Sequence, residues 1–349
     1  MVRHNVRTSV RTLTFSVVST VMGIASLGLG QASALAGGTC QNVTVPVALA
    51  AGQSANQSLA GTFCVPSTWA PGTHDVDVLV HGATYDRSYW DWPQNSPTYS
   101  YVSRTLQAGR ATFAYDQLGS GGSSRPASAS LNPGSVAYVM HQAVQWVRGQ
   151  GYTQVTGVGH SFGSMAAIDE AATYHDVDRL VVTGLFHADG PYALLGVPDF
   201  YPAALDPAFI GHISDLGYLT TTPGTRGGLF YNTTTADPAV IVYDEAHKDV
   251  VSATQFSLGL TEFEVPAGLN VAAGVTVPVL SISGQQDGIT CGLLLDCNNP
   301  AQVQANETAF YTGAPSVTTA VVPDTGHDIN LHPSAASSFA TINSWIQSN

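Results

Sequence analysis

A serine stands between two glycines in the run Gly159-His-Ser161-Phe-Gly163, and this spacing could carry nucleophilic chemistry. A β-branched run precedes the serine and an Ala-rich run follows it, so we predict a strand, a tight turn and a helix with Ser161 at the apex. The glycines leave room for so sharp a turn. The Phe162 N–H then lies at the helix N-terminus, where it can face a developing oxyanion. An ordinary Gly/Ser turn is the alternative, because G-x-S-x-G also arises by chance.

An acid and a base follow two later runs that we predict to be strands. Asp287 comes directly after the first run and His327 directly after the second. We expect both to lie near Ser161, because ligand sites of open α/β sheets form at the carboxyl ends of the strands. An imidazole can take the serine proton during attack, and a buried carboxylate can orient the imidazole. Asp189 is the alternative acid.

A further predicted strand, residues 76–80, ends at His81-Gly-Ala83. The turn after it puts a backbone N–H, that of Ala83, at the same sheet edge. Together with the Phe162 N–H, it would form an oxyanion hole. We expect His81 to hold the loop in place rather than to act as a base.

Predicted strands and helices alternate along most of the chain, which indicates an α/β fold with a mostly parallel central sheet flanked by helices. Residues 188–275 break this rhythm. They are rich in aromatic residues and contain two Asp-Pro helix starts, at Asp206 and Asp237. We therefore predict a core made of residues 37–187 and 276–349 with a helical lid between them. The lid aromatics could form its own core or line a substrate pocket.

Residues 1–36 have the pattern of a secretory signal peptide: three arginines, an interrupted apolar run and a small-residue cleavage site. A retained membrane anchor is the alternative. Removing the segment takes the net charge from −13 to −16, because it contains three arginines and no acid. Such a surface repels nucleic acid and anionic membranes. We expect a secreted, extracellular protein with no membrane anchor after signal removal.

Four cysteines in an exported chain favour disulfides. Pairing by neighbourhood would join Cys40 to Cys64 and Cys291 to Cys297, although four cysteines allow three connectivities. Metal ligation is less favoured, since the chain has no Cys-x-x-Cys motif and no matching histidine spacing.

Taken together, these residues resemble the α/β-hydrolase superfamily over nearly all of the chain after residue 36. The order serine, aspartate, histidine is that of the superfamily. The resemblance implies ester, thioester or related acyl hydrolysis without a metal or cofactor. The serine at the elbow argues against epoxide hydrolases and haloalkane dehalogenases, which carry aspartate there. The resemblance rests on His81-Gly82-Ala83, Asp116-x-x-Gly119-x-Gly121-x-Ser123-x-x-Pro126, Gly159-x-Ser161-x-Gly163, Gly284-x-x-Asp287 and Gly326-His327.

Within that superfamily, the chain looks like secreted carboxylesterases and lipases that act on small apolar esters. Secreted exopeptidases are the second possibility, because Glu262 and Glu264 could hold a substrate ammonium group. Hydroxynitrile lyases of this fold use a lid lysine, and Lys248 is the one lysine of the chain that could take that role. A non-catalytic binding module is a fourth possibility, but such proteins usually lose the serine or the histidine.

Overall fold

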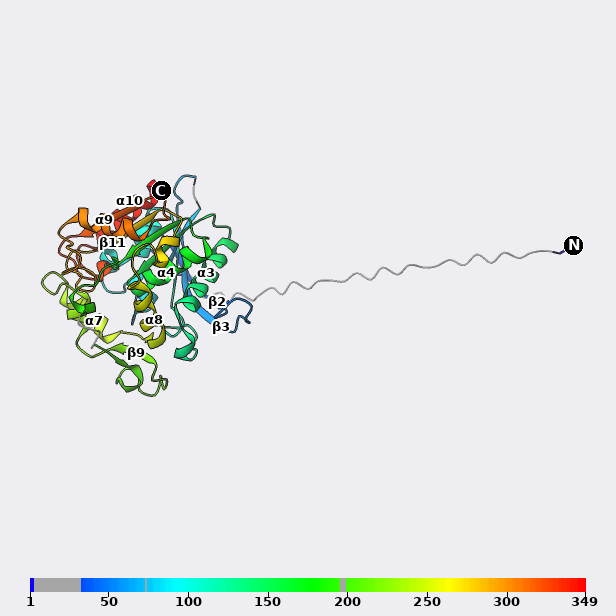
Figure 1. Cartoon of the computed structure of the whole chain (residues 1–349). Helices are drawn as coiled ribbons and strands as arrows, with labels where there is room; N and C mark the ends of the chain where they lie inside the picture. Colours follow the sequence, from blue (N-terminus) through cyan, green and yellow to red (C-terminus); the bar gives the residue numbers. More distant parts are fainter. Residues whose placement is uncertain (3–32, 73, 195–198) are drawn as a thin grey trace.

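The computed structural model describes residues 1–2, 33–72, 74–194 and 199–349. The predicted signal peptide, residues 1–36, lies mostly outside these ranges, and its removal stays a prediction. A long sheet runs through the centre of the molecule, with helices on both of its faces (Figure 1).

The central sheet confirms the predicted mostly parallel arrangement. Its strand order in the described residues is β1-β2-β3-β5-β4-β6-β7-β11-β12. The pairs from β1 to β5 are antiparallel, and those from β5 to β12 are parallel. The strands are β1 (Ser33–Leu35), β2 (Gly38–Val47), β3 (Gln57–Pro66), β4 (Asp75–Val80), β5 (Ala111–Tyr115), β6 (Gln154–His160), β7 (Arg179–Thr183), β11 (Val279–Gly284) and β12 (Val317–Val322).

The inner parallel strands β4, β5, β7 and β11 are buried along their whole length, and β6 is buried after its first residue, as is typical of parallel sheets covered on both faces. Strand β7 ends at Thr183, because Gly184 turns the chain with a φ of 63°.

Two hydrophobic clusters cover opposite faces of the sheet. Val78 of β4 belongs to the cluster that includes α3 and α4, whereas its neighbour Leu79 belongs to the cluster with α2 and α10. Side chains alternate between the faces of a strand, so the two clusters are separated by the sheet. The helices of this core are α1 (Ser96–Tyr99), α2 (Tyr101–Gln107), α3 (Pro133–Gly149), α4 (Phe162–Tyr174), α9 (Pro300–Phe310) and α10 (Ala335–Ser348), with the short turns η1 (Arg87–Trp90), η2 (Ser128–Ser130) and η5 (Ile329–Leu331).

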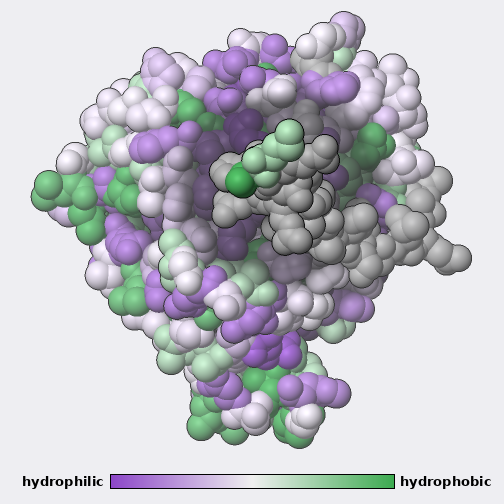
Figure 2. Space-filling view, turned by 90° about the vertical axis from the view of Figure 1, so that its right-hand side faces the viewer, coloured by the Kyte–Doolittle hydropathy of each residue, from purple (hydrophilic) through white to green (hydrophobic). Residues whose placement is uncertain are grey.

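Between β7 and β11 the chain forms short helices and also a small antiparallel sheet in the order β10-β9-β8, which we did not predict. This region lies at the lower end of the molecule in Figure 1, where Figure 2 shows hydrophobic surface. Leu205, Ile210 and Leu216 are exposed there. Its elements are α5 (Pro191–Leu194), β8 (Phe200–Pro202), η3 (Ala203–Leu205), β9 (Tyr218–Thr221), α6 (Arg226–Phe230), α7 (Pro238–Ala246), β10 (Val251–Ser252), α8 (Ala253–Phe263) and η4 (Val271–Gly274).

One of the two Asp-Pro helix starts is correct and the other is wrong. Asp237 caps α7 by accepting from Ala239 N at 2.9 Å. Asp206 accepts from Ala208 N at 2.8 Å in the same way, but residues 207–212 form turns and no helix. Gly211, near the end of these turns, has a φ of 82°, which a helix does not accommodate. Asp206 therefore makes the capping hydrogen bond of a helix start, but the turns after it do not continue into a helix.

Two disulfides are present, and they join the pairs predicted from neighbourhood. Cys40 and Cys64 stand directly opposite each other on β2 and β3. Cys291 and Cys297 close a loop of the chain between β11 and α9. In the described ranges, no helix is both long enough and apolar enough to cross a membrane.

A buried ion pair between β4 and the start of β5 provides a test of the fold. Arg110 Nη2 donates to Asp77 Oδ2 at 2.9 Å, and Tyr101 Oη donates to the same oxygen at 2.9 Å. Asp77→Ala leaves a buried guanidinium without its carboxylate, so we expect a loss of about 3–5 kcal/mol in the free energy of unfolding. Urea unfolding followed by circular dichroism measures it.

The matched control is the double variant Asp77→Leu with Arg110→Met, which removes both charges. It should be clearly more stable than Asp77→Ala alone. Equal losses in the two variants would mean that packing, rather than the charge, dominates at this position.

Candidate active site

Ser161 lies at a strained turn between β6 and α4. Its backbone has φ 52° and ψ −118°, which residues with a side chain rarely adopt. The flanking glycines allow this turn. A Cβ at Gly159 would lie 2.4 Å from Gly163 O, and a Cβ at Gly163 would lie 2.3 Å from Val80 O. The G-x-S-x-G spacing thus reflects close backbone contacts on both sides of the serine.

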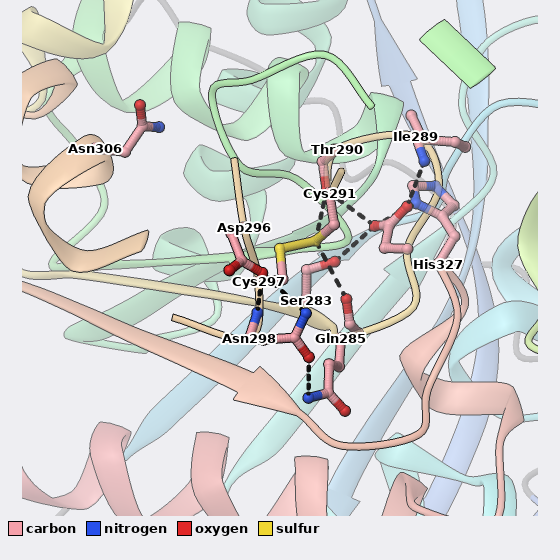
Figure 3. The surroundings of a disulfide bond; sticks show 12 residues. Ser283, Gln285, Ile289, Thr290, Cys291, Asp296, Cys297, Asn298, Asn306 and His327 are labelled. Carbon is pink, nitrogen blue, oxygen red and sulfur yellow. Dashed lines mark hydrogen bonds and ion pairs between the residues drawn. A yellow bond between two sulfur atoms is a disulfide. The ribbon is translucent and has the colours of Figure 1, made fainter. Parts of the chain in front are cut away.

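The structure brings Asp287 and His327 together after β11 and β12. His327 Nδ1 lies 2.9 Å from Asp287 Oδ2, and both side chains are buried. Asp287 Oδ2 also accepts from Ser283 Oγ at 2.7 Å, and its Oδ1 accepts from Ile289 N at 3.0 Å (Figure 3). These hydrogen bonds hold the Asp287 carboxylate in the position where it faces His327 Nδ1. Asp189, the alternative acid, takes no part in this arrangement.

The other imidazole nitrogen is the one available for chemistry. Because Nδ1 faces a carboxylate, it carries the proton, and Nε2 is the basic nitrogen. Nε2 of His327 is buried and has no hydrogen-bond partner in the part of the chain that is described. His327 and Ser161 line the same pocket.

The two members of this pair shift each other's pKa. Burial lowers the pKa of His327, but the charge and hydrogen bond of Asp287 outweigh it, so the pKa lies above the usual 6.5. Burial raises the pKa of Asp287, but His327 and the hydrogen bonds from Ser283 and Ile289 hold it below its usual value. Asp287 is thus ionised at neutral pH, as an orienting carboxylate must be.

The loop after β4 lies against the serine turn. A Cβ at Gly82 would come within 3.2 Å of Ser161 Cβ, and Ala83 and Phe162 both line the pocket. His81 fixes this loop: its Nε2 accepts from the Gln117 N–H at 3.0 Å, so its Nδ1 carries the proton and donates to Gly82 O at 2.8 Å. This is the structural role expected for His81.

The pocket beside Ser161 has a cavity volume of about 80 Å³, and its lining surface is mostly apolar. The core contributes Leu185 and Ile289 to its lining. Much of the remaining lining comes from the segment between β7 and β11: Tyr192, Ala193, Phe200, Leu229, Phe230, Phe256 and Leu260. Some aromatics of this segment therefore face the pocket, whereas others pack within it, as Tyr243 does against His247.

The groups that would support other activities lie elsewhere. Glu262 faces a second, smaller hollow together with Asp169, and neither it nor Glu264 lines the pocket with Ser161. Lys248 is buried, and its Nζ donates to Asp206 Oδ2 at 2.7 Å and to Thr221 O at 2.6 Å. Among the described pocket residues there is thus no carboxylate for a substrate ammonium group and no lysine for a lyase.

Sequence reasoning missed a second histidine–aspartate pair behind the first. His160 Nε2 lies 2.9 Å from Asp328 Oδ1, and both side chains are fully buried. Tyr85 Oη contacts Asp328 Oδ2 and also lies 2.9 Å from Asp244 Oδ2. The positions of His160 and Asp328, next to Ser161 and His327, were the only sequence signal that pointed to them.

The protonation of this second pair follows from its hydrogen bonds. A hydroxyl has one proton, so Tyr85 can donate to only one of its two carboxyl neighbours, and the other must donate to it. Asp244 is held by Arg226 at 2.7 Å and remains the acceptor. Burial raises the pKa of Asp328 and lowers the pKa of His160, so both favour their uncharged forms. An uncharged Asp328 would not attract a protonated His327 ring, so Asp287 is the carboxylate that pairs with it.

His332 holds the loop that carries His327. Its Nε2 accepts from the N–H groups of Gly326 at 3.1 Å and Asn232 at 3.0 Å. Its Nδ1 therefore carries the proton and donates to Asp328 O at 2.8 Å. The loop is thus fixed on both sides of His327.

The disulfide Cys291–Cys297 lies next to the loop that carries Asp287 (Figure 3). Cys291 N donates to Asp287 O at 2.8 Å, and Thr290 Oγ1 donates to Asp287 Oδ2 at 3.2 Å. Two of the donors to the carboxylate, Ile289 and Thr290, therefore directly precede the disulfide loop.

One set of possible metal ligands lies at the site itself. His160, His327 and Asp328 have ligand atoms within 4.8 Å of one another. The hydrogen bond between His160 and Asp328 accounts for two of these atoms, and the third belongs to His327, which lines the same pocket as Ser161. This cluster is explained without an ion.

Comparison with known proteins agrees with this geometry. The model of the alpha/beta hydrolase family matches residues 78–337. No curated protein matches the sequence. Solved structures with a similar fold include a carboxyl esterase from Bacillus coagulans (18% identity, 88% of this chain and 98% of that chain covered, TM-score 0.62). A thermophilic esterase from Thermogutta terrifontis (19%, 88% and 98%, 0.59) and a monoacylglycerol lipase from Paleococcus ferrophilus (18%, 83% and 98%, 0.56) are also similar.

At these identities the structural matches establish the fold, and the family match extends over most of the chain, from within β4 to within α10. It includes the strand ends that carry Ser161, Asp287 and His327. The chain belongs to the alpha/beta hydrolase family.

Proposed function

We propose that this protein is a secreted serine esterase that cleaves carboxylic esters of small apolar substrates through an acyl-enzyme intermediate. The observation that carries the proposal is the 2.9 Å contact between His327 and Asp287, with the second imidazole nitrogen unpartnered in the pocket that holds Ser161. Ester hydrolysis needs a nucleophile, a base and an oriented carboxylate in this relation.

In the proposed reaction, Ser161 Oγ attacks the ester carbonyl carbon while His327 Nε2 takes the hydroxyl proton. The carbonyl oxygen becomes an oxyanion, which accepts hydrogen bonds from the N–H groups of Ala83 and Phe162. The C–O bond to the alcohol then breaks, and His327 gives its proton to the departing oxygen. Water attacks the acyl-enzyme with His327 again as the base, and the acid leaves. Asp287 stays ionised throughout.

The apolar pocket lining supports a substrate with a hydrocarbon acyl or alcohol group. Residues 188–275 contribute several of the lining side chains, and we propose that this segment is a lid over the active site. The signal-peptide pattern and the two disulfides support an extracellular location. A peptide substrate with a free amino group would need a carboxylate that the described lining lacks.

Ser161→Ala tests the nucleophile. We expect kcat for p-nitrophenyl esters to fall by a factor of about 10⁴ or more, because the remaining groups cannot form an acyl-enzyme. The measurement is hydrolysis of a series of p-nitrophenyl esters of increasing acyl length, with amino-acyl p-nitroanilides beside it. Turnover close to wild type in the variant would remove Ser161 from the mechanism, and cleavage of the anilides would favour an exopeptidase.

The pH dependence tests the base. His327 acts only when its Nε2 is unprotonated, and Asp287 raises the pKa of its imidazole. We therefore expect kcat/KM to fall as the pH decreases through a value above 6.5, the usual histidine pKa. Asp287→Asn should lower kcat by roughly 10⁴ and move this acid limb to lower pH.

Asp328→Asn is the matched control for Asp287→Asn. Burial raises the pKa of Asp328 and favours its uncharged form, which an amide resembles, so we expect kcat to change by less than about ten-fold. A larger loss for Asp328→Asn than for Asp287→Asn would reverse the assignment of the orienting acid.

The double variant Cys291→Ser with Cys297→Ser tests the support of the acid loop. We expect kcat to fall by roughly ten-fold, because small displacements of catalytic groups are costly. The control is Cys40→Ser with Cys64→Ser, which should lower the free energy of unfolding by about 2–4 kcal/mol and leave kcat of the folded protein unchanged. If both pairs affect kcat equally, the disulfide has no specific role at Asp287.

A further inference from the structure

Three polar side chains meet where α3, α4 and the loop after α4 come together. His141 lies on α3, Glu170 on α4 and Asp176 in the loop, and helices α3 and α4 are neighbours (Figure 1). One potential ligand atom from each lies within 4.8 Å of the other two. None of the three lines the pocket that contains Ser161, so the esterase mechanism makes no use of them.

The hydrogen bonds of this group are incomplete. Glu170 is 0% exposed, and neither of its carboxylate oxygens has a hydrogen-bond partner among the described residues. Asp176 Oδ1 also has none in that part of the chain. His141 Nδ1 comes within 2.7 Å of Asp176 Oδ2, but the two are not aligned as a hydrogen bond. If both carboxyls are ionised, these buried oxygens have no donor, which is costly. Either a proton shared between Glu170 and Asp176 or a bound cation would satisfy them.

We propose that His141, Glu170 and Asp176 bind one divalent transition-metal ion, with zinc as the representative. One imidazole nitrogen and two carboxylates are ligands that zinc accepts, and three protein ligands leave a position for water. Calcium prefers a shell made of oxygen atoms alone. The side chains of His141 and Asp176 are 24% and 15% exposed, so the ion can enter from solvent.

Neighbouring groups orient two of the ligands. Gln145 Nε2 donates to Asp176 Oδ2 at 2.5 Å, and the ring of His141 stacks on Tyr174 with a centroid distance of 4.2 Å. Such contacts outside the ligands usually accompany metal sites. The ion would connect α3 to the C-terminal part of α4 and to the loop after it. It would thereby stabilise the helix that starts at Ser161 without touching the substrate.

A shared proton is the alternative occupant. Burial, followed by the neighbouring Asp176, raises the pKa of Glu170 to about 10, so the metal-free carboxyl carries a proton. Glu170→Gln separates the two occupants. The amide can donate the hydrogen bond that a protonated carboxyl makes to Asp176, but it cannot supply a negatively charged ligand.

The test is a titration of the full secreted chain, treated with EDTA and dialysed, with zinc chloride alone. We expect calorimetry to give one zinc ion per chain and thermal unfolding to show a higher Tm with zinc. Glu170→Gln and His141→Ala should each weaken zinc binding at least ten-fold and abolish the Tm shift. The control is His212→Ala, an exposed histidine outside the cluster, which should bind zinc as the wild type does.

Absence of zinc binding at concentrations up to about 1 mM would overturn the proposal, as would unchanged binding in both cluster variants. Unchanged Tm in Glu170→Gln together with no zinc response in the wild type would assign the site to the shared proton. Should circular dichroism show that Glu170→Gln is unfolded, His141→Ala decides, because His141 is partly exposed and its loss leaves the core intact. Each of these readouts is independent of ester hydrolysis, so the outcome does not depend on the proposed activity.

Discussion

Ser161 takes a backbone conformation with a positive φ, and such strain persists only where the surrounding contacts hold it. Here the contacts are made by the backbone itself. Gly163 packs so closely on Val80 O that no side chain fits between α4 and the end of β4. The turn, the helix behind it and the neighbouring loop with Ala83 are therefore positioned together. Any pocket chemistry at this edge depends on that close approach.

Two aspartates lie near His327, and their surroundings divide their roles. Asp287 receives hydrogen bonds from Ser283 and Ile289, and these together with His327 keep it ionised. Asp328 is buried beside Tyr85 and favours its protonated form. In the proposed mechanism, an uncharged Asp328 would leave Asp287 as the one charged carboxylate that orients the His327 imidazole.

The sequence was most informative where function depends on local spacing. The serine turn needs glycines two residues away on each side, and Asp287 and His327 directly follow strands, so all three could be located before the fold was known. The prediction that residues 188–275 are helical was incomplete, because they also contain a small sheet. Strands β8, β9 and β10 contain only three, four and two residues, which is too short for a periodic signal. Asp206 has the capping residue of a helix, but the turn ends at Gly211.

Contacts between distant residues could not be read from the sequence. His160 and Asp328 are 168 positions apart, and Tyr85 and Asp328 are 243 apart, so no motif links them. The cluster of His141, Glu170 and Asp176 could not be predicted for the same reason, because its members meet only when α3 packs against α4. His160, Asp328 and Glu170 are also titratable side chains in fully buried positions, which apolar residues usually occupy.

The central claim is that Ser161 is a nucleophile activated by His327. The most direct measurement is labelling of the protein with a serine-directed fluorophosphonate, followed by intact mass spectrometry and peptide mapping. We predict one adduct per chain, located on Ser161, with labelling that slows as the pH falls through a value above 6.5 and that is absent from Ser161→Ala. No adduct, or an adduct on another residue, would contradict the account.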